Sequence, residues 1–124
     1  MSSNSPETSQ DPIQDLRNKL RQFAAERDWD QFHSPKNLAM ALSVEAAELL
    51  EHFQWLSETD SAAMTPEKQA RIGEELADVL LYLIRLADKL NIDLVTAAAA
   101  KINVNALKYP AQKARGSNKK YTEL

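Results

Sequence analysis

Apolar residues recur at intervals of three and four along most of the chain, which is the pattern of amphipathic α-helices. This pattern predicts four helices, over residues 12–28, 35–57, 66–90 and 94–108. The second segment is apolar around much of its circumference, so we expect it at the centre of a bundle. The sequence therefore predicts an all-α, four-helix-bundle-like fold that oligomerises through its central helices.

Short polar side chains followed by proline mark the helix starts. Asp11-Pro12, Ser34-Pro35 and Thr65-Pro66 each place a capping residue before a proline of the first turn, and Pro110 ends the last helix. Residues 58–65 are expected to form a loop. We therefore divide the chain into a disordered segment over 1–11, a helical domain over 12–110 and a basic C-terminal tail over 111–124.

Glycine and cysteine usage excludes several classes of protein. The chain has two glycines, with no glycine-rich phosphate loop and no Asn-Gly or Asp-Gly hairpin turn. Rossmann-type folds and tight β-hairpins depend on such glycines. There is no cysteine, so disulfides, thiolate metal sites and cysteine nucleophiles are excluded.

Charge and hydropathy narrow the expected partners and location. The formal net charge is −3, whereas a dedicated nucleic-acid binder is usually basic overall. The tail over 111–124 is basic, but the remainder of the chain is acidic and opposes nucleic-acid binding. No apolar run approaches the roughly 20 residues of a membrane span, and residues 1–12 do not resemble a secretory signal. We expect neither a nucleic acid nor a membrane as partner, and a cytoplasmic location.

Two pairs of acidic residues lie within the most apolar predicted helices. Glu45-x-x-Glu48 and Glu75-x-x-Asp78 share one spacing, and three residues along a helix place both carboxylates of a pair on one face. Either pair alone is most simply a solvated face. However, positions 41, 49, 52, 79 and 82 carry no lysine or arginine that would neutralise the acids. Antiparallel packing of the two helices would bring all four carboxylates together.

Such a cluster predicts a bound cation. Four carboxylates in one place repel one another and raise their pKa values unless a cation is present. Oxygen ligands favour Mg²⁺, Mn²⁺ or Ca²⁺, and Mg²⁺ completes its coordination with substrate phosphates. A di-iron bundle would need Glu-x-x-His motifs, but Glu51 stands three residues after Glu48 and His52 stands four after it. We therefore expect Mg²⁺ or Mn²⁺ and a phosphorylated substrate.

A polar stripe and a set of aromatic residues are further candidates. Lys101, Asn105 and Tyr109 recur at intervals of four, which is an ordinary polar face unless a metal-phosphate site lies beside it. Trp29 and Trp55 stand at predicted helix ends. They either cover an edge of the core or stack on a nucleobase, which contributes about 1–3 kcal/mol per base.

In combination these motifs resemble a known family. The two acidic pairs, followed by Lys101-x-x-x-Asn105-x-x-Lys108-Tyr109-Pro110, are similar to the all-α NTP pyrophosphohydrolases of the MazG-like superfamily. The segments FAAERDWDQFHSPKN (23–37), EHFQW (51–55) and ARGSNKKYTEL (114–124) resemble its dCTP pyrophosphatase branch. The resemblance covers residues 16–124.

The resemblance implies a reaction and roles for individual residues. Members hydrolyse nucleoside triphosphates between the α- and β-phosphates, which in this branch removes unwanted cytidine triphosphates from the nucleotide pool. It implies a homotetramer that is a dimer of dimers. The implied Mg²⁺ ligands are Glu45, Glu48, Glu75 and Asp78. The implied base pocket contains Trp29, His33 and Trp55, and the implied sugar and phosphate contacts are Tyr82, Lys101, Asn105 and Tyr109.

Two alternatives stay open at this point. The general base is Glu48 or Glu45, and we favour Glu48 although the spacing does not distinguish the two. The family motif often begins with two consecutive glutamates, and Val44 occupies the first of these positions here. A non-catalytic helical binding or scaffold module is the competing hypothesis for the whole chain.

Overall fold

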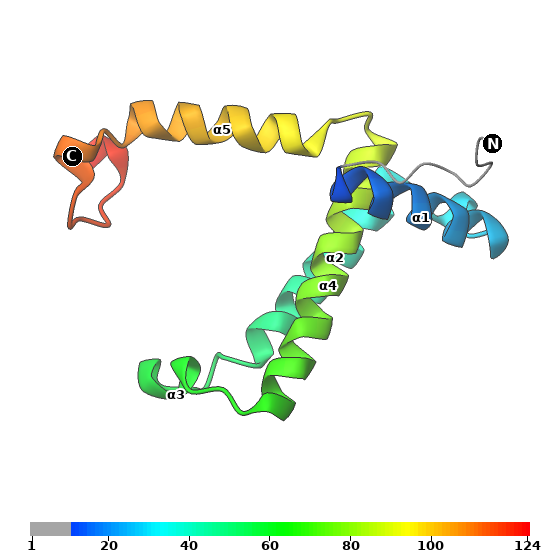
Figure 1. Cartoon of the computed structure of the whole chain (residues 1–124), viewed down its shortest axis with the longest axis horizontal. Helices are drawn as coiled ribbons and strands as arrows, with labels where there is room; N and C mark the ends of the chain where they lie inside the picture. Colours follow the sequence, from blue (N-terminus) through cyan, green and yellow to red (C-terminus); the bar gives the residue numbers. More distant parts are fainter. Residues whose placement is uncertain (1–10) are drawn as a thin grey trace, which may run out of the picture. The chain divides into compact units, whose positions relative to one another are not determined.

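The structure, a computed structural model, describes residues 11–124, and helices are the only regular elements in that range (Figure 1). The long helices are α1 (Pro12–Glu26), α2 (Pro35–Glu51), α4 (Pro66–Lys89) and α5 (Leu94–Lys108). The short ones are η1 (Asp30–Phe32), α3 (Glu58–Ala62), α6 (Ala111–Ala114) and η2 (Tyr121–Glu123). The predicted all-α fold and its four long helices are confirmed. Of the segment expected to be disordered, 1–11, residues 1–10 lie outside the described residues, whereas Asp11 is ordered and its side chain accepts a hydrogen bond from the Ile13 amide at 2.9 Å.

The predicted capping residues begin the long helices. The Ser34 hydroxyl accepts a hydrogen bond from the Asn37 amide at 3.1 Å, and the Thr65 hydroxyl accepts one from the Lys68 amide at 3.2 Å. Such caps satisfy amides of the first turn that have no partner within the helix. The starts of α2 and α4 are therefore set by local sequence.

The helix ends differ from the prediction. Helix α1 ends at Glu26, and Asp28 (φ 54°) has a left-handed conformation that breaks the helix. Helix α2 ends at Glu51 instead of 57, because residues 52–56 form successive turns. The expected loop over 58–65 contains the five-residue helix α3. The Ser57 hydroxyl accepts a hydrogen bond from the Asp60 amide at 3.1 Å and caps this helix.

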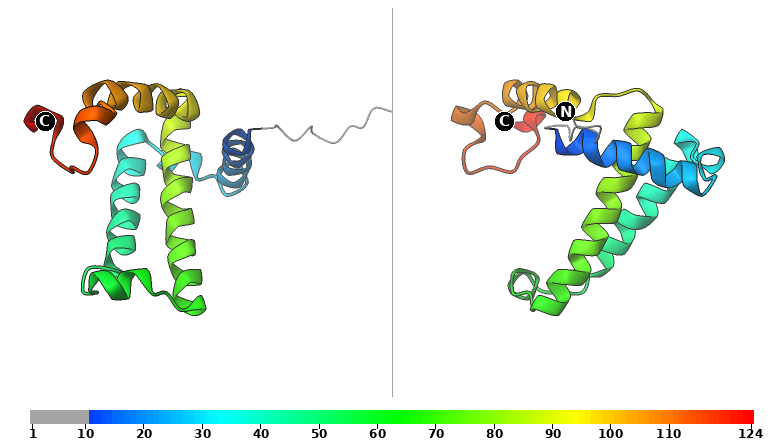
Figure 2. Two further views of the ribbon diagram at one scale, coloured as in Figure 1. Left: turned by 60° about the vertical axis from the view of Figure 1, so that its left-hand side comes forward. Right: turned by 45° about the vertical axis from the view of Figure 1, so that its right-hand side comes forward.

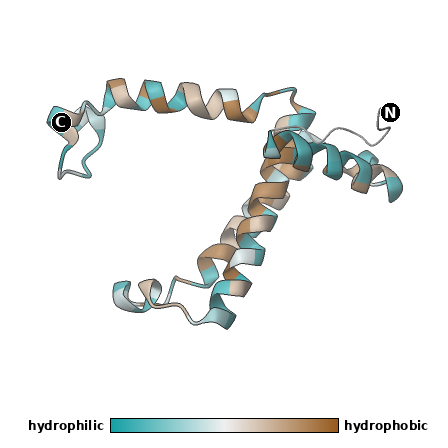
Figure 3. Cartoon of the chain, in the orientation of Figure 1, coloured by the Kyte–Doolittle hydropathy of each residue, from teal (hydrophilic) through white to brown (hydrophobic). Residues whose placement is uncertain are grey.

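Residues 11–91 belong to the first of two compact units. Helices α2 and α4 lie side by side and antiparallel, and α1 packs against α4 (Figures 1 and 2). Figure 3 shows apolar residues concentrated along α2 and α4. The buried apolar residues within the described part of this unit are Ala24, Leu38, Ile72, Ile84 and Ala87. Because α2 and α4 are neighbours, their two acidic motifs lie on adjacent helices.

Residues from Ile92 onwards form the second unit, which contains α5, α6 and η2. The tail folds back on the end of α5. The Tyr121 ring lies edge-on to the Tyr109 ring, with centroids 6.0 Å apart, and Lys108 Nζ lies 5.0 Å from the Tyr121 centroid. Across residues 11–124, none of the helices has both the length and the apolar content needed to cross a membrane.

Candidate active site

Three of the predicted metal ligands converge between α2 and α4. Glu45 and Glu48 from α2 and Glu75 from α4 each offer a carboxylate oxygen, and these oxygens all lie within 4.8 Å of one another. Asp78, one turn further along α4, lies outside this group of three. Its negative charge nevertheless contributes to raising the pKa of Glu45, so it acts on the same cluster.

The cluster carries negative charge that the protein does not compensate. Glu45 Oε2 and Glu75 Oε2 are buried without a hydrogen-bond partner among the described residues. Burial is the largest cause that raises the pKa of Glu45 to about 7, and the adjacent carboxylates of Glu75, Glu48 and Asp78 contribute to the same shift. The ion pairs found within the described range, 11–124, involve acids outside this cluster, namely Glu26, Asp30 and Asp88. An unpartnered buried carboxylate is costly unless a proton or a cation satisfies it.

The donor set fits a hard divalent cation. All the converging groups are carboxylates, which are the ligands that Mg²⁺, Mn²⁺ and Ca²⁺ prefer. The two orphaned buried oxygens of Glu45 and Glu75 are the atoms that a cation would satisfy. The cluster is therefore suited to hold such an ion.

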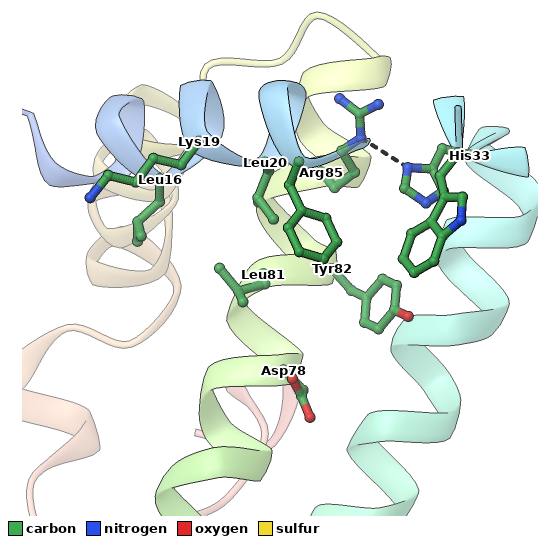
Figure 4. Close-up of a pocket in the computed structure, with 10 residues that line it drawn as sticks. Leu16, Lys19, Leu20, His33, Asp78, Leu81, Tyr82 and Arg85 are labelled. Atoms are coloured by element: carbon green, nitrogen blue, oxygen red, sulfur yellow. Dashed lines mark hydrogen bonds between the residues drawn. The ribbon is translucent and has the colours of Figure 1, made fainter. Parts of the chain in front are cut away.

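A pocket of about 400 Å³ opens beside the cluster, between α1, α4 and the segment that carries η1 (Figure 4). Its walls are mostly apolar. Trp29 packs edge-on against Phe23, with ring centroids 5.7 Å apart. The lining residues are Leu16, Lys19, Leu20, Phe23, Trp29, His33, Asp78, Leu81, Tyr82 and Arg85. The pocket thus contains three of the predicted substrate contacts, namely Trp29, His33 and Tyr82.

The other predicted substrate contacts do not line this pocket. Trp55 lies in the turns after α2 and is 87% exposed. Lys101, Asn105 and Tyr109 belong to α5 and its C-cap in the second unit. Within that unit Lys101 and Asn105 are exposed, whereas Tyr109 is partly covered by Tyr121.

Comparison with known proteins now decides the family. The sequence model of the MazG-like family matches residues 40–124, which include both acidic pairs. The chain belongs to the MazG-like family. It is 46% identical over 114 residues to dCTP pyrophosphatase 1 of Homo sapiens, covering 90% of this chain and 67% of the human protein. It is 43% identical over 119 residues to dCTP pyrophosphatase 1 of Bos taurus, covering 94% and 70%.

A solved structure supports the same assignment. The crystal structure of a pyrophosphatase from Archaeoglobus fulgidus DSM 4304 superposes with a TM-score of 0.77 at 37% identity. The match covers 86% of this chain and 99% of the archaeal one. The fold of this MazG-like chain is therefore that of a MazG-type pyrophosphatase.

Arg85 is a site residue that the sequence reasoning missed. It is 6% exposed, its Nε donates to His33 Nδ1 at 3.1 Å, and its Nη2 donates to Asp30 Oδ1 at 2.7 Å. A signal was present, because a single arginine interrupts the apolar run LLYLIRLA (80–87) two turns after Asp78. Two turns place Arg85 on the same face of α4 as Asp78 and Tyr82.

The geometry connects the pocket of this MazG-like chain to its acidic cluster. Asp78 lines the pocket, and its charge also acts on Glu45. A flat aromatic group in the pocket would lie between apolar side chains, and phosphates attached to it would reach towards the carboxylates. The site can therefore combine recognition of a nucleobase with cation-assisted phosphate chemistry.

Proposed function

We propose that this chain is a nucleotide diphosphatase that hydrolyses dCTP or modified cytidine triphosphates to the monophosphate and pyrophosphate, and so removes unwanted triphosphates from the nucleotide pool. The observation that carries the proposal is an uncompensated carboxylate cluster next to an aromatic-lined pocket. Relatives named dCTP pyrophosphatase 1, at 43–46% identity, support the choice of substrate.

In this proposal Glu45, Glu48, Glu75 and Asp78 hold Mg²⁺, which Mn²⁺ can replace. When bound, the ion would supply positive charge that offsets the negative charge of the phosphate oxygens. The orphaned oxygens of Glu45 and Glu75 support this assignment, since both need a positive partner once they are ionised.

Glu48 is the proposed general base. It accepts a proton from the water that attacks the phosphoanhydride between the α- and β-phosphates. A new bond forms between the water oxygen and phosphorus while the anhydride bond breaks, which releases pyrophosphate and the monophosphate. We favour Glu48 over Glu45 because the buried Oε2 of Glu45 needs a positive partner, which commits Glu45 to binding the cation.

The substrate contacts are divided among several segments. Trp29 and His33 hold the base, with Tyr82 towards the sugar, and their shared pocket supports this. In the assembled enzyme Trp55 adds to the base pocket, and Lys101, Asn105 and Tyr109 contact sugar and phosphates. Lysine provides a point charge for phosphate, and the asparagine amide and the tyrosine hydroxyl provide hydrogen bonds.

The proposed assembly is a homotetramer built as a dimer of dimers, located in the cytoplasm where free nucleoside triphosphates occur. Large apolar side chains on α2 and α4, such as Val44 (56% exposed) and Leu76 (52% exposed), support association. Size-exclusion chromatography with light scattering should give four times the 13.9 kDa of one chain. A particle with the mass of a single chain would refute the assembly.

One assay tests the reaction. The protein is incubated with each deoxynucleoside triphosphate and Mg²⁺, and pyrophosphate and orthophosphate are measured separately. Pyrophosphate from dCTP supports the proposal, and orthophosphate alone would mean that a different bond is cleaved. No release from any nucleotide would favour a non-catalytic helical scaffold. Glu74→Ala is a matched control for Glu48→Ala, because Glu74 is an exposed acid of α4 outside the cluster.

A further inference from the structure

We propose that Arg85 is a positioning residue that holds His33 in the neutral tautomer protonated on Nε2, so that the pocket presents a fixed hydrogen-bond donor that selects cytosine over thymine or uracil. The inference deepens the proposed function and rests on it for the identity of the substrate.

The hydrogen bond between the two side chains dictates the tautomer. Arg85 Nε donates to His33 Nδ1 at 3.1 Å. A guanidinium has donors and no acceptor, and it does not lose its proton in proteins. Nδ1 must therefore be the unprotonated nitrogen, and the single ring proton of neutral His33 lies on Nε2. Burial, together with the positive charges of Arg85 and Lys89, lowers the pKa of His33 and favours this neutral form.

The guanidinium is held in place on its other side. Asp30 accepts from Arg85 Nη2 at 2.7 Å and also pairs with Lys89. Asp88 lies 3.6 Å from Arg85 Nη1 and is itself bound by two nitrogens of Arg21. Because Arg85 is 6% exposed and anchored by two carboxylates, it keeps one orientation towards His33.

The remaining nitrogen of His33 is open to the pocket. His33 lines the pocket, and Figure 4 shows its imidazole joined to Arg85 by a hydrogen bond. Within residues 11–124, the buried side-chain atoms without a partner are carboxylate oxygens of Glu45 and Glu75. Nε2 is not among them and has no hydrogen bond to a described residue, so its N–H is available to a ligand.

A fixed donor distinguishes pyrimidines by the state of their N3 atom. Cytosine N3 is an acceptor, whereas N3 of thymine and uracil carries a hydrogen. Placing the Nε2–H of His33 against such an N3–H leaves two donors facing each other, and a site with an unpaired buried donor strongly disfavours that ligand. We therefore expect the preference for dCTP over dTTP to depend on the pair of Arg85 and His33.

The first test uses the unmodified protein and nitrogen-15 NMR of its histidine rings at neutral pH. His33 and His52 are the two histidines, and His52→Gln assigns their signals. We expect an unprotonated Nδ1 and a protonated Nε2 for His33. Addition of dCMP should shift the Nε2–H signal downfield, and dTMP should not. A proton on Nδ1, or equal shifts with both nucleotides, would overturn the proposal without reference to catalysis.

The second test measures kcat/KM for dCTP and dTTP in Arg85→Met. We expect the ratio of the two values to fall about tenfold, which corresponds to about 1.4 kcal/mol. Arg71→Met is the matched control, because Arg71 is an exposed arginine of the same helix that does not line the pocket, and its ratio should be unchanged. An unchanged ratio in Arg85→Met, or an equal loss for both nucleotides, would contradict the proposal.

These tests separate the inference from the proposed function. If the unmodified protein hydrolyses no nucleotide, the proposed function fails while the ring-proton measurement still decides the tautomer. If Arg85→Met does not fold, the nucleotide titrations of the unmodified protein decide the selectivity. The result expected from both is a neutral His33 that donates to cytosine.

Discussion

Replacing Glu45 with glutamine should stabilise the cation-free protein above neutral pH and abolish its stabilisation by divalent cations. The pKa of Glu45 is raised from 4.5 to about 7 in the folded state. A group of this kind contributes stability that is fully present below pH 4.5 and is lost as the pH rises through about 7. The folded protein therefore carries an unfavourable negative charge at pH 8, which the neutral amide removes.

The size of this effect follows from the difference between the two pKa values. One pKa unit corresponds to about 1.36 kcal/mol, and solvent screening reduces the effect for a partly exposed group. Glu45→Gln should therefore raise the free energy of unfolding at pH 8 by about 1–3 kcal/mol. For a chain of this length each kcal/mol raises the melting temperature by about 3–6 °C.

Differential scanning calorimetry at pH 5 and pH 8, with EDTA or with Mg²⁺, measures the effect. The cation-free original protein should melt at a lower temperature at pH 8 than at pH 5, and Mg²⁺ should restore much of the loss by binding the folded state. The melting temperature of Glu45→Gln should change neither between pH 5 and pH 8 nor on addition of Mg²⁺. The exposed Glu74→Gln should behave like the original protein. A lower melting temperature of cation-free Glu45→Gln at pH 8, or an undiminished Mg²⁺ effect in this variant, would refute the reasoning.

Three further predictions concern the site and the fold. Glu48→Ala and Asp78→Ala should each abolish release of pyrophosphate from dCTP while the far-ultraviolet circular dichroism stays unchanged. Leu38→Ala should cost about 2–5 kcal/mol of unfolding free energy in urea, because Leu38 is 1% exposed and its loss leaves a cavity. Asp88→Asn should destabilise the protein at pH 7, since Arg21 lowers the pKa of Asp88 below 3.8. This stability is present above pH 3.8 and is lost as the pH falls through the folded pKa, so urea unfolding near pH 2 should not distinguish Asp88→Asn from the original.

The sequence predicted helix starts better than helix ends, for a physical reason. A start such as Ser34-Pro35 is encoded by the capping residue and proline alone. The end of α1 depends on the left-handed Asp28 and on the hydrogen bond from the Trp29 amide to the Ala24 carbonyl at 2.9 Å, neither of which hydrophobic periodicity registers. The short helix α3 was missed because its one cap, Ser57, precedes too few residues to form a periodic pattern.

In the site, too, features set by local sequence were predicted, and contacts between residues distant in sequence were not. Convergence of Glu45, Glu48 and Glu75 followed from their spacing and from antiparallel packing of adjacent helices. The bond between Arg85 and His33 joins residues 52 positions apart in sequence, and spacing within one helix carries no information about such a pair. Contacts of this kind need the path of the chain between α1 and α2 to be known.

The capped starts of α2 and α4 have a consequence for how the protein tolerates change in evolution. Each acidic motif lies about three turns after its capping residue, so the number of residues between them determines the direction in which the carboxylates point. Inserting one residue between Pro35 and Glu45 would swing the carboxylates by about 100° and carry them away from α4. Substitutions at exposed positions between cap and motif should therefore be common among functional variants, whereas single-residue insertions and deletions should be confined to segments such as 57–64.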